Sequence, residues 1–232
     1  MPASDSIEQN LLRVLERVNN AALRCGRDPA SVRVVAVSKK MPPEAVLSAA
    51  RAGATLFGEN YIQEARDKIA ALAAERLSWH FIGKLQTNKA KYAAKLFTMI
   101  HTVDSEALAV ELDRRMAALG SSMPVLLQVN VAGEQSKSGT SPEAAPDLAR
   151  RVAELPNLEL RGLMTMPPYD DPEKSRPHFA ALAALARRIR DLGLPGVSMH
   201  ELSMGMSHDL EAAVAEGATL VRVGTAIFGE RE

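Results

Sequence analysis

The hydrophobic positions of this chain change their spacing in a regular way. In the first part, apolar residues recur three or four positions apart, at Ile7, Leu11, Val14, Leu15 and Val18. This spacing predicts an amphipathic helix. A capping box at Ser6 and Gln9 precedes the helix, and Gly26 follows it. Further along, short β-branched runs alternate with longer Ala- and Leu-rich stretches that carry charges on one side, which indicates repeated βα units.

Eight strands and seven further helices follow from this alternation. The strands are predicted at 32–38, 55–57, 79–82, 99–103, 125–130, 158–164, 199–202 and 220–223, and the helices at 43–52, 61–74, 88–96, 105–119, 142–155, 176–192 and 209–216. Eight βα units without a Pro/Gly/Ser-rich linker favour a closed parallel barrel over an open sheet. We therefore predict an α/β fold, a single (β/α)8 TIM barrel domain over residues 1–232. Because few residues follow Gly224, we expect the extra N-terminal helix to cover the flank of the eighth strand.

Composition narrows the classes of partner. Basic and acidic residues both number 28, so no net field attracts nucleic acid or anionic lipid, and a small-molecule ligand is favoured. Cys25 is the one cysteine, and the first ten residues lack the pattern of a signal peptide, so we expect a cytoplasmic protein. We also expect a monomer, although no motif bears on the oligomeric state. No apolar run approaches the roughly 20 residues of a membrane span. The five histidines show no metal-binding spacing, and no metal site is predicted.

Candidate ligand-binding residues follow the seventh and eighth strands. In (β/α)8 barrels, ligands bind at the carboxyl ends of the strands, and phosphate is often held after strands seven and eight. Here those loops contain Ser207, Gly224 and Thr225. The glycine lets backbone N–H groups approach an anion closely, and the two hydroxyls add hydrogen-bond donors without adding charge. We interpret them as a phosphate cup. The alternative is that Ser207 only caps the following helix and Gly224 only turns the chain.

Two cations lie at the ends of predicted strands. Lys39 directly follows the apolar run 34–37, where partial burial would favour a neutral amine able to form a Schiff base with an aldehyde. The alternative is an ordinary solvated lysine. Lys40 should point to the other face and stay in water. Arg222 interrupts an apolar strand and needs a partner, either a carboxylate or the ring nitrogen of a cofactor.

Other polar residues near strand ends are less diagnostic. Asn60 follows the second strand and either orients a ligand or closes a turn. His80 and His101 lie within strands three and four, and we interpret them as core histidines whose ring nitrogens form hydrogen bonds. A basic cluster follows strand three at Lys84, Lys89, Lys91 and Lys95. A solvated helix face is the favoured interpretation of the cluster, and a second anion site is the alternative.

Seven segments are specific as a set and span nearly the whole chain in order. They are VAVSK (35–39), FGENYIQEA (57–65), WHFIGKLQTNK (79–89), SKSG (136–139), RGLMTM (161–166), LSMGMSHD (202–209) and VRVGTAIFG (221–229). Together they resemble the pyridoxal phosphate homeostasis protein family. The resemblance implies a barrel of the alanine racemase type, with pyridoxal 5′-phosphate joined to Lys39 as a Schiff base. It also implies that Ser207, Gly224 and Thr225 hold the phosphate, Arg222 faces the pyridine nitrogen and Asn60 lines the ring. His80 and Met204 match family positions near the pocket.

The resemblance further implies a binding protein rather than an enzyme. Its expected role is to hold the cofactor, limit its free concentration and deliver it to pyridoxal phosphate-dependent apo-enzymes. An arginine at the pyridine nitrogen weakens the ring as an electron sink, which agrees with this role. Two alternatives stay open, an amino acid racemase or decarboxylase that uses the same cofactor, and a class I aldolase-like enzyme whose Lys39 binds a sugar phosphate.

Overall fold

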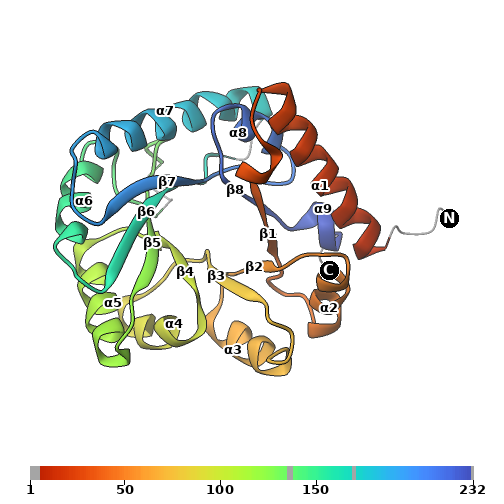
Figure 1. The fold of residues 1–232 in the computed structure, drawn as a ribbon, viewed down its shortest axis with the longest axis horizontal. Coiled ribbons are helices and arrows are strands. Elements are labelled where there is room, and N and C mark those ends of the chain that lie inside the picture. Colours follow the sequence, from red (N-terminus) through yellow and green to blue (C-terminus); the bar gives the residue numbers. More distant parts are fainter. Residues whose placement is uncertain (1–5, 135–137, 169–170, 231–232) are drawn as a thin grey trace.

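The computed structural model describes residues 6–134, 138–168 and 171–230, and within them the predicted barrel is confirmed. The parallel strands close in chain order, each pairing with the next and β8 pairing with β1 (Figure 1). They are β1 (Arg33–Val37), β2 (Leu56–Glu59), β3 (Ser78–Phe81), β4 (Met99–Val103), β5 (Met123–Gln128), β6 (Leu158–Met164), β7 (Val197–Ser203) and β8 (Leu220–Val223). Ser136 and Lys137 of the SKSG segment lie outside the described residues.

Helices surround the barrel, and most begin and end close to their predicted bounds. They are α1 (Ile7–Arg24), α2 (Pro43–Arg51), α3 (Ile62–Ala71), α4 (Ala90–Leu96), α5 (Glu106–Leu119), α6 (Ala145–Ala153), α7 (Pro172–Arg190), α8 (Leu210–Ala215) and α9 (Thr225–Phe228), with short 3-10 turns η1 (Pro29–Ser31) and η2 (Thr87–Lys89). Within the described part of the chain, no helix is both long and apolar enough to cross a membrane.

Two helix predictions were incomplete. Helix α7 begins at Pro172 rather than at 176, because the Asp171 side chain caps it by accepting the N–H of Glu173 and proline is tolerated in a first turn. The one-turn helix α9, which begins at Thr225, was not predicted at all. The first turn of α7 is polar and contains proline, and α9 spans only four residues, so hydrophobic spacing carries little information in either case.

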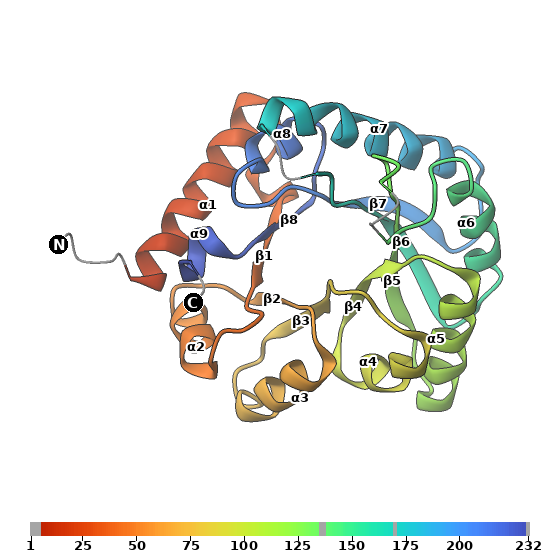
Figure 2. The same ribbon diagram turned by 180° about the vertical axis from the view of Figure 1, so that it is seen from behind.

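Helix α1 closes the helical ring, as predicted. It begins with the Ser6/Gln9 capping box and packs against α2, α8 and α9, beside the paired strands β8 and β1 (Figures 1 and 2). Asn10 donates to the carbonyl of Ile227, and Arg17 forms an ion pair with Glu211 at 2.8 Å. The N-terminal helix therefore also supports the loops that follow β7 and β8.

The barrel interior has an apolar layer and a polar layer. The apolar layer consists of Val35, Leu56, Met99, Leu126, Met164 and Leu220. Because side chains two positions apart in a strand share a face, His101 lies inside one layer nearer the carboxyl ends than Met99, and Arg222 lies one layer nearer than Leu220. The polar layer therefore sits directly below the mouth of the barrel, where ligands bind in this fold.

Candidate functional site

A cavity of about 410 Å³ opens at the carboxyl ends of the strands. Six of the predicted cofactor residues line it, namely Lys39, Asn60, Ser207, Arg222, Gly224 and Thr225. Val37, Ile82, Met166, Met206, His208 and Ala226 complete the wall. Residues from both ends of the sequence thus meet in one site because β8 pairs with β1.

The two loops of the predicted phosphate cup are bonded to each other. The Ser207 hydroxyl accepts the N–H of Ala226 at 3.3 Å, which joins the loop after β7 to the loop after β8. Ser207 does not cap α8, so that alternative is wrong, and Asp209 instead accepts the N–H of Met206 at 2.6 Å. Arg17 of α1 donates to the Ser207 carbonyl at 3.0 Å. The cup is therefore anchored on the outside by α1.

Gly205 gives the first of these loops its shape. Its φ of 89° is one that side chains rarely adopt, and a Cβ there would lie 2.5 Å from the Cβ of Ala213. This close packing lets the Gly205 carbonyl accept the N–H of Arg222 at 2.9 Å. This bond fixes the loop after β7 to β8 at Arg222, whose side chain lines the cavity.

A buried ion pair supports the segment that carries Lys39. The Lys68 ammonium on α3 lies 2.6 Å from Glu59 Oε1 and donates to the Ser38 carbonyl at 2.7 Å, and the Ser38 hydroxyl donates to the same carboxylate oxygen. Lys68 is 3% exposed and Glu59 is fully buried. Burial raises the pKa of Glu59, against the bonds from Lys68 and Ser38, which lower it.

Lys39 and Lys40 are directed apart at the end of β1. Lys39 is half-buried and lines the cavity, whereas Lys40 is exposed, as predicted. Lys40 adopts a left-handed φ of 62°, and its backbone N–H donates to Glu64 of α3. Glu64 also pairs with Lys68 at 2.9 Å. The ion-paired end of α3 therefore fixes the turn through which the chain leaves the site.

Arg222 is a buried cation that is paired with neutral groups. It is 4% exposed, and its guanidinium donates to the Ser203 hydroxyl at 2.6 Å and to the Thr165 carbonyl at 2.8 Å. In the described structure, no carboxylate lies within 4.0 Å of it, so the predicted direct ion pair of Arg222 is wrong. Burial lowers the pKa of Arg222 to about 10, although the charge of the buried Asp209 acts on Arg222 from farther away and raises its pKa. The group therefore stays charged at neutral pH.

The hydrogen bonds continue from Arg222 across the polar layer. Ser203 Oγ lies 2.9 Å from His101 Nδ1, and His101 Nε2 lies 2.9 Å from His80 Nδ1. His80 and His101 are therefore the hydrogen-bonded core histidines that the sequence indicates. Neither His80 nor Met204 lines the cavity, and Met204 is completely buried in the core between sheet and helices.

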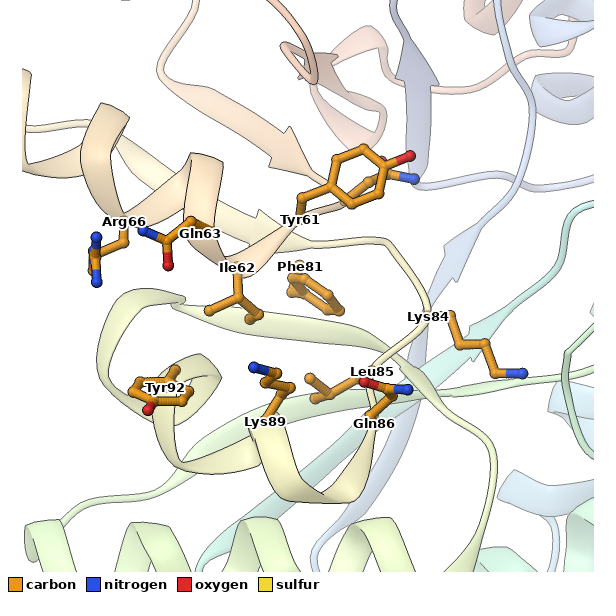
Figure 3. Close-up of a pocket in the computed structure, with 11 residues that line it drawn as sticks. Tyr61, Ile62, Gln63, Arg66, Phe81, Lys84, Leu85, Gln86, Lys89 and Tyr92 are labelled. Atoms are coloured by element: carbon orange, nitrogen blue, oxygen red, sulfur yellow. The ribbon is translucent and has the colours of Figure 1, made fainter.

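Two lysines of the basic cluster, Lys84 and Lys89, line a second, smaller pocket of about 340 Å³. Gln63 and Arg66 of α3 lie across it from Lys89 and Tyr92 (Figure 3). The ammonium groups of Lys89 and Lys91 lie 5.8 and 4.8 Å from the centre of the Tyr92 ring. The four lysines of the cluster are exposed, which agrees with a solvated face.

Comparison with known proteins places the chain in a family. The family model described as "Alanine racemase, N-terminal domain" matches residues 5–232. A relative from Pseudomonas aeruginosa, named pyridoxal phosphate homeostasis protein, is 49% identical over 227 residues, which cover 98% of this chain and 96% of the relative. The chain belongs to the pyridoxal phosphate homeostasis protein family. A relative of the same name from Escherichia coli is 42% identical and covers 98% of both chains.

Solved structures agree with this membership of the pyridoxal phosphate homeostasis protein family. One from Bifidobacterium adolescentis has a TM-score of 0.90 at 38% identity, covering 95% of this chain and 94% of that one. PipY of Synechococcus elongatus, solved with PLP bound, has a TM-score of 0.81 at 40% identity. The alignment with PipY covers 93% of this chain and all of that one.

In this family member, the sequence pattern did not indicate three polar residues that support the site. Ser203 contacts Arg222 directly, whereas Lys68 and Glu59 bond to Ser38, the residue before Lys39. The i,i+4 spacing of Glu64 and Lys68 was the one available signal for the ion-paired cluster. For Ser203, a serine at a strand end carries no indication that an arginine on the next strand contacts it.

Proposed function

We propose that this chain binds pyridoxal 5′-phosphate in the cavity at the mouth of the barrel and takes part in controlling its concentration in the cytoplasm. Lys39 would hold the cofactor as a Schiff base, and the protein would deliver it to apo-enzymes that depend on it. The name of the relatives and the PLP bound by PipY support this proposal. The exposed free Cys25 agrees with a reducing compartment.

The buried Arg222 carries the proposal. A desolvated guanidinium is costly unless its N–H groups find acceptors, yet Arg222 is bonded to two neutral oxygens and also borders the cavity. The Oδ1 atom of Asn60, which lines the same cavity, is buried and has no hydrogen-bond partner. These groups fit a planar ligand with a ring nitrogen that accepts from Arg222 and a polar hydrogen that reaches Asn60.

Lys39 is positioned to carry the covalent bond. Pyridoxal 5′-phosphate would supply an aldehyde as the electrophile, and Lys39 would supply the amine that condenses with it, with loss of water. Ser38 and the carboxylate–ammonium pair of Glu59 and Lys68 hold the backbone immediately before Lys39. The amine therefore enters the cavity from a fixed strand end rather than from a free loop.

The hydroxyls of Ser207 and Thr225 are expected to hold the phosphate. Replacing both, as Ser207→Ala together with Thr225→Ala, should weaken retention of the cofactor by roughly 2 kcal/mol or more, because bonds to a charged group exceed about 1 kcal/mol each. The dissociation constant of pyridoxamine 5′-phosphate, which cannot form the Schiff base, measures this loss. Ser6→Ala, at the distant start of α1, is the control, and an unchanged constant in the double variant would remove the phosphate cup from the site.

The lining of the cavity favours binding over catalysis. Besides Lys39, its described residues include one histidine, His208, and no carboxylate, tyrosine or cysteine. Arg222 as the partner of the pyridine nitrogen would disfavour its protonation and weaken electron withdrawal by the ring. A racemase or decarboxylase would instead show exchange of solvent deuterium at the Cα of an amino acid substrate.

The direct test is an absorbance spectrum of the purified protein, followed by borohydride reduction and peptide mass mapping. We expect a yellow protein in which reduction fixes the cofactor on the peptide that contains Lys39. A colourless protein that neither binds added pyridoxal 5′-phosphate nor retains a reduced adduct would reject the proposal. Reduction onto Lys39 of a sugar phosphate instead would establish the aldolase-like alternative.

A further inference from the structure

A continuous line of hydrogen bonds crosses the polar layer of the barrel interior, from β8 through β7 and β4 to β3. Its members are Arg222, Ser203, His101 and His80, with exposed fractions of 4%, 0%, 0% and 5%. The contacts between neighbouring members measure 2.6, 2.9 and 2.9 Å. These side chains are closed off from bulk solvent, so each polar atom depends on its neighbours for a partner.

We propose that Ser203, His101 and His80 are positioning residues that orient Arg222 toward the cavity, through hydrogen bonds that all run in one direction. This inference rests on the proposed function in so far as Arg222 contacts the cofactor. The direction itself follows from the protein atoms alone.

The direction is fixed by Arg222, because a guanidinium donates hydrogen bonds and never accepts them. Its Nη1 therefore donates to Ser203 Oγ. The described structure gives that hydroxyl one other partner, the Nδ1 atom of His101. If His101 also donated to Ser203, the hydroxyl hydrogen would be buried without an acceptor, which is costly. Ser203 must then donate to His101 Nδ1.

The proton positions on the two histidines follow from this. A neutral imidazole has one N–H and one acceptor nitrogen, so a His101 that accepts at Nδ1 carries its proton on Nε2. It donates that proton to Nδ1 of His80, and His80 in turn carries its proton on Nε2. Both histidines have to be neutral for this arrangement. Burial lowers the pKa of His80 to about 3 and the pKa of His101 well below its ordinary value, with smaller effects from nearby charges.

A neutral line of this kind suits the task of holding Arg222. A carboxylate in the place of Ser203 would form an ion pair with the guanidinium and neutralise the charge that faces the cavity. The hydroxyl instead takes one N–H, and the Thr165 carbonyl takes another at 2.8 Å. The guanidinium is thus fixed in orientation from the side of the barrel core while its positive charge stays available to a ligand.

The first test uses the unliganded wild-type protein and needs no cofactor. Long-range ¹H–¹⁵N spectra of the histidines report which ring nitrogen carries the proton. We expect His80 and His101 to be neutral, with the proton on Nε2, at neutral pH. A proton on Nδ1 of His101, or a charged His101, would overturn the direction of the line whatever the protein binds.

The second test compares Ser203→Ala with Thr102→Val. Ser203→Ala removes the link to Arg222, whereas Thr102 is a buried neighbour of His101 on β4 whose hydroxyl has no hydrogen-bond partner. In Ser203→Ala we expect the His101 signals to move, the absorption band of bound pyridoxal 5′-phosphate to shift, and the affinity for pyridoxamine 5′-phosphate to fall about tenfold. Thr102→Val should leave all three unchanged.

The outcomes separate this inference from the proposed function. A Ser203→Ala protein with the wild-type band and affinity would reject the positioning role while the wild type still binds the cofactor. A wild type that binds no cofactor would reject the proposed function, and with it the positioning role, even if the tautomers are as derived. If Ser203→Ala fails to fold, His101→Phe, which keeps an aromatic ring but has no ring nitrogen, replaces it in the same comparison.

Discussion

Lys39→Ala is expected to lose all covalently held cofactor while the protein keeps its fold. The side chain lies at the mouth of the barrel and lines the cavity, so its removal leaves the core between sheet and helices unchanged. The amine is the one group proposed to bond to the cofactor, and no neighbouring hydroxyl forms a Schiff base. Borohydride reduction followed by mass spectrometry of the intact protein measures the loss, and circular dichroism checks the fold.

The adjacent lysine gives the matched control for this variant. Lys40 has the same chemistry one position later but is exposed, and its contact with Glu64 is made by the backbone N–H. Lys40→Ala should therefore retain the reducible adduct. An undiminished amount of adduct in Lys39→Ala would show that Lys39 is not the anchor. Mapping of the reduced adduct onto Lys40 in the wild-type protein would show the same. Binding of pyridoxamine 5′-phosphate by Lys39→Ala would show that the cavity still accepts the ring and the phosphate.

Lys68→Met is expected to be the most destabilising of the substitutions considered. It leaves Glu59 fully buried beside Ser38 without its counter-charge. Breaking a buried ion pair in this way costs about 3–5 kcal/mol of unfolding free energy, because an uncompensated charge stays in the interior. Urea denaturation measures the loss. Cofactor affinity should fall as well, because Lys68 also holds the Ser38 carbonyl next to Lys39.

The loss in Lys68→Met should depend on pH in a defined direction. Burial already raises the pKa of Glu59, and removal of the ammonium raises it further. A carboxyl whose pKa is higher in the folded state than in the unfolded state binds its proton more tightly when folded. The difference in unfolding free energy between the variant and the wild type is therefore smallest in acid, and it grows as the pH rises through the folded-state pKa of Glu59. Denaturation curves at about pH 5 and about pH 8 compare the two.

A double variant separates the charge effect from the loss of packing. In Glu59→Gln together with Lys68→Met, no fully buried charge is left uncompensated, since Glu64, the other partner of Lys68, is partly exposed. Much of the stability should therefore return, and the pH dependence that comes from Glu59 should disappear. Equal losses in the single and double variants at both pH values would contradict the ion-pair explanation. They would indicate that Lys68 stabilises the protein through its bonds to the Ser38 carbonyl and Glu64, which both variants lose, rather than through Glu59.

The sequence by itself determined the barrel and the end of it at which the candidate site lies. Hydrophobic spacing reports which face of each element is buried, and eight βα units leave few alternatives to a closed barrel. Because the carboxyl ends of parallel strands meet at one edge, Lys39 and Ser207 were predicted to lie together from their places at strand and loop boundaries. The position of Arg222 within a strand left its partner open, and only the family resemblance implied that it lies in the same site. All three line one cavity.

Only the tertiary structure decided which polar groups pair. Ser207 bonds to the loop of Ala226 rather than capping α8, and Arg222 is held by Ser203 rather than by a carboxylate. His101 and Ser203 lie 102 positions apart in the sequence yet share a hydrogen bond. Hydrophobic periodicity indicates which side chains are buried but not which polar groups form hydrogen bonds with each other. A hydrogen bond requires a donor–acceptor distance that is correct to within a few tenths of an ångström, and closure of the barrel sets that distance.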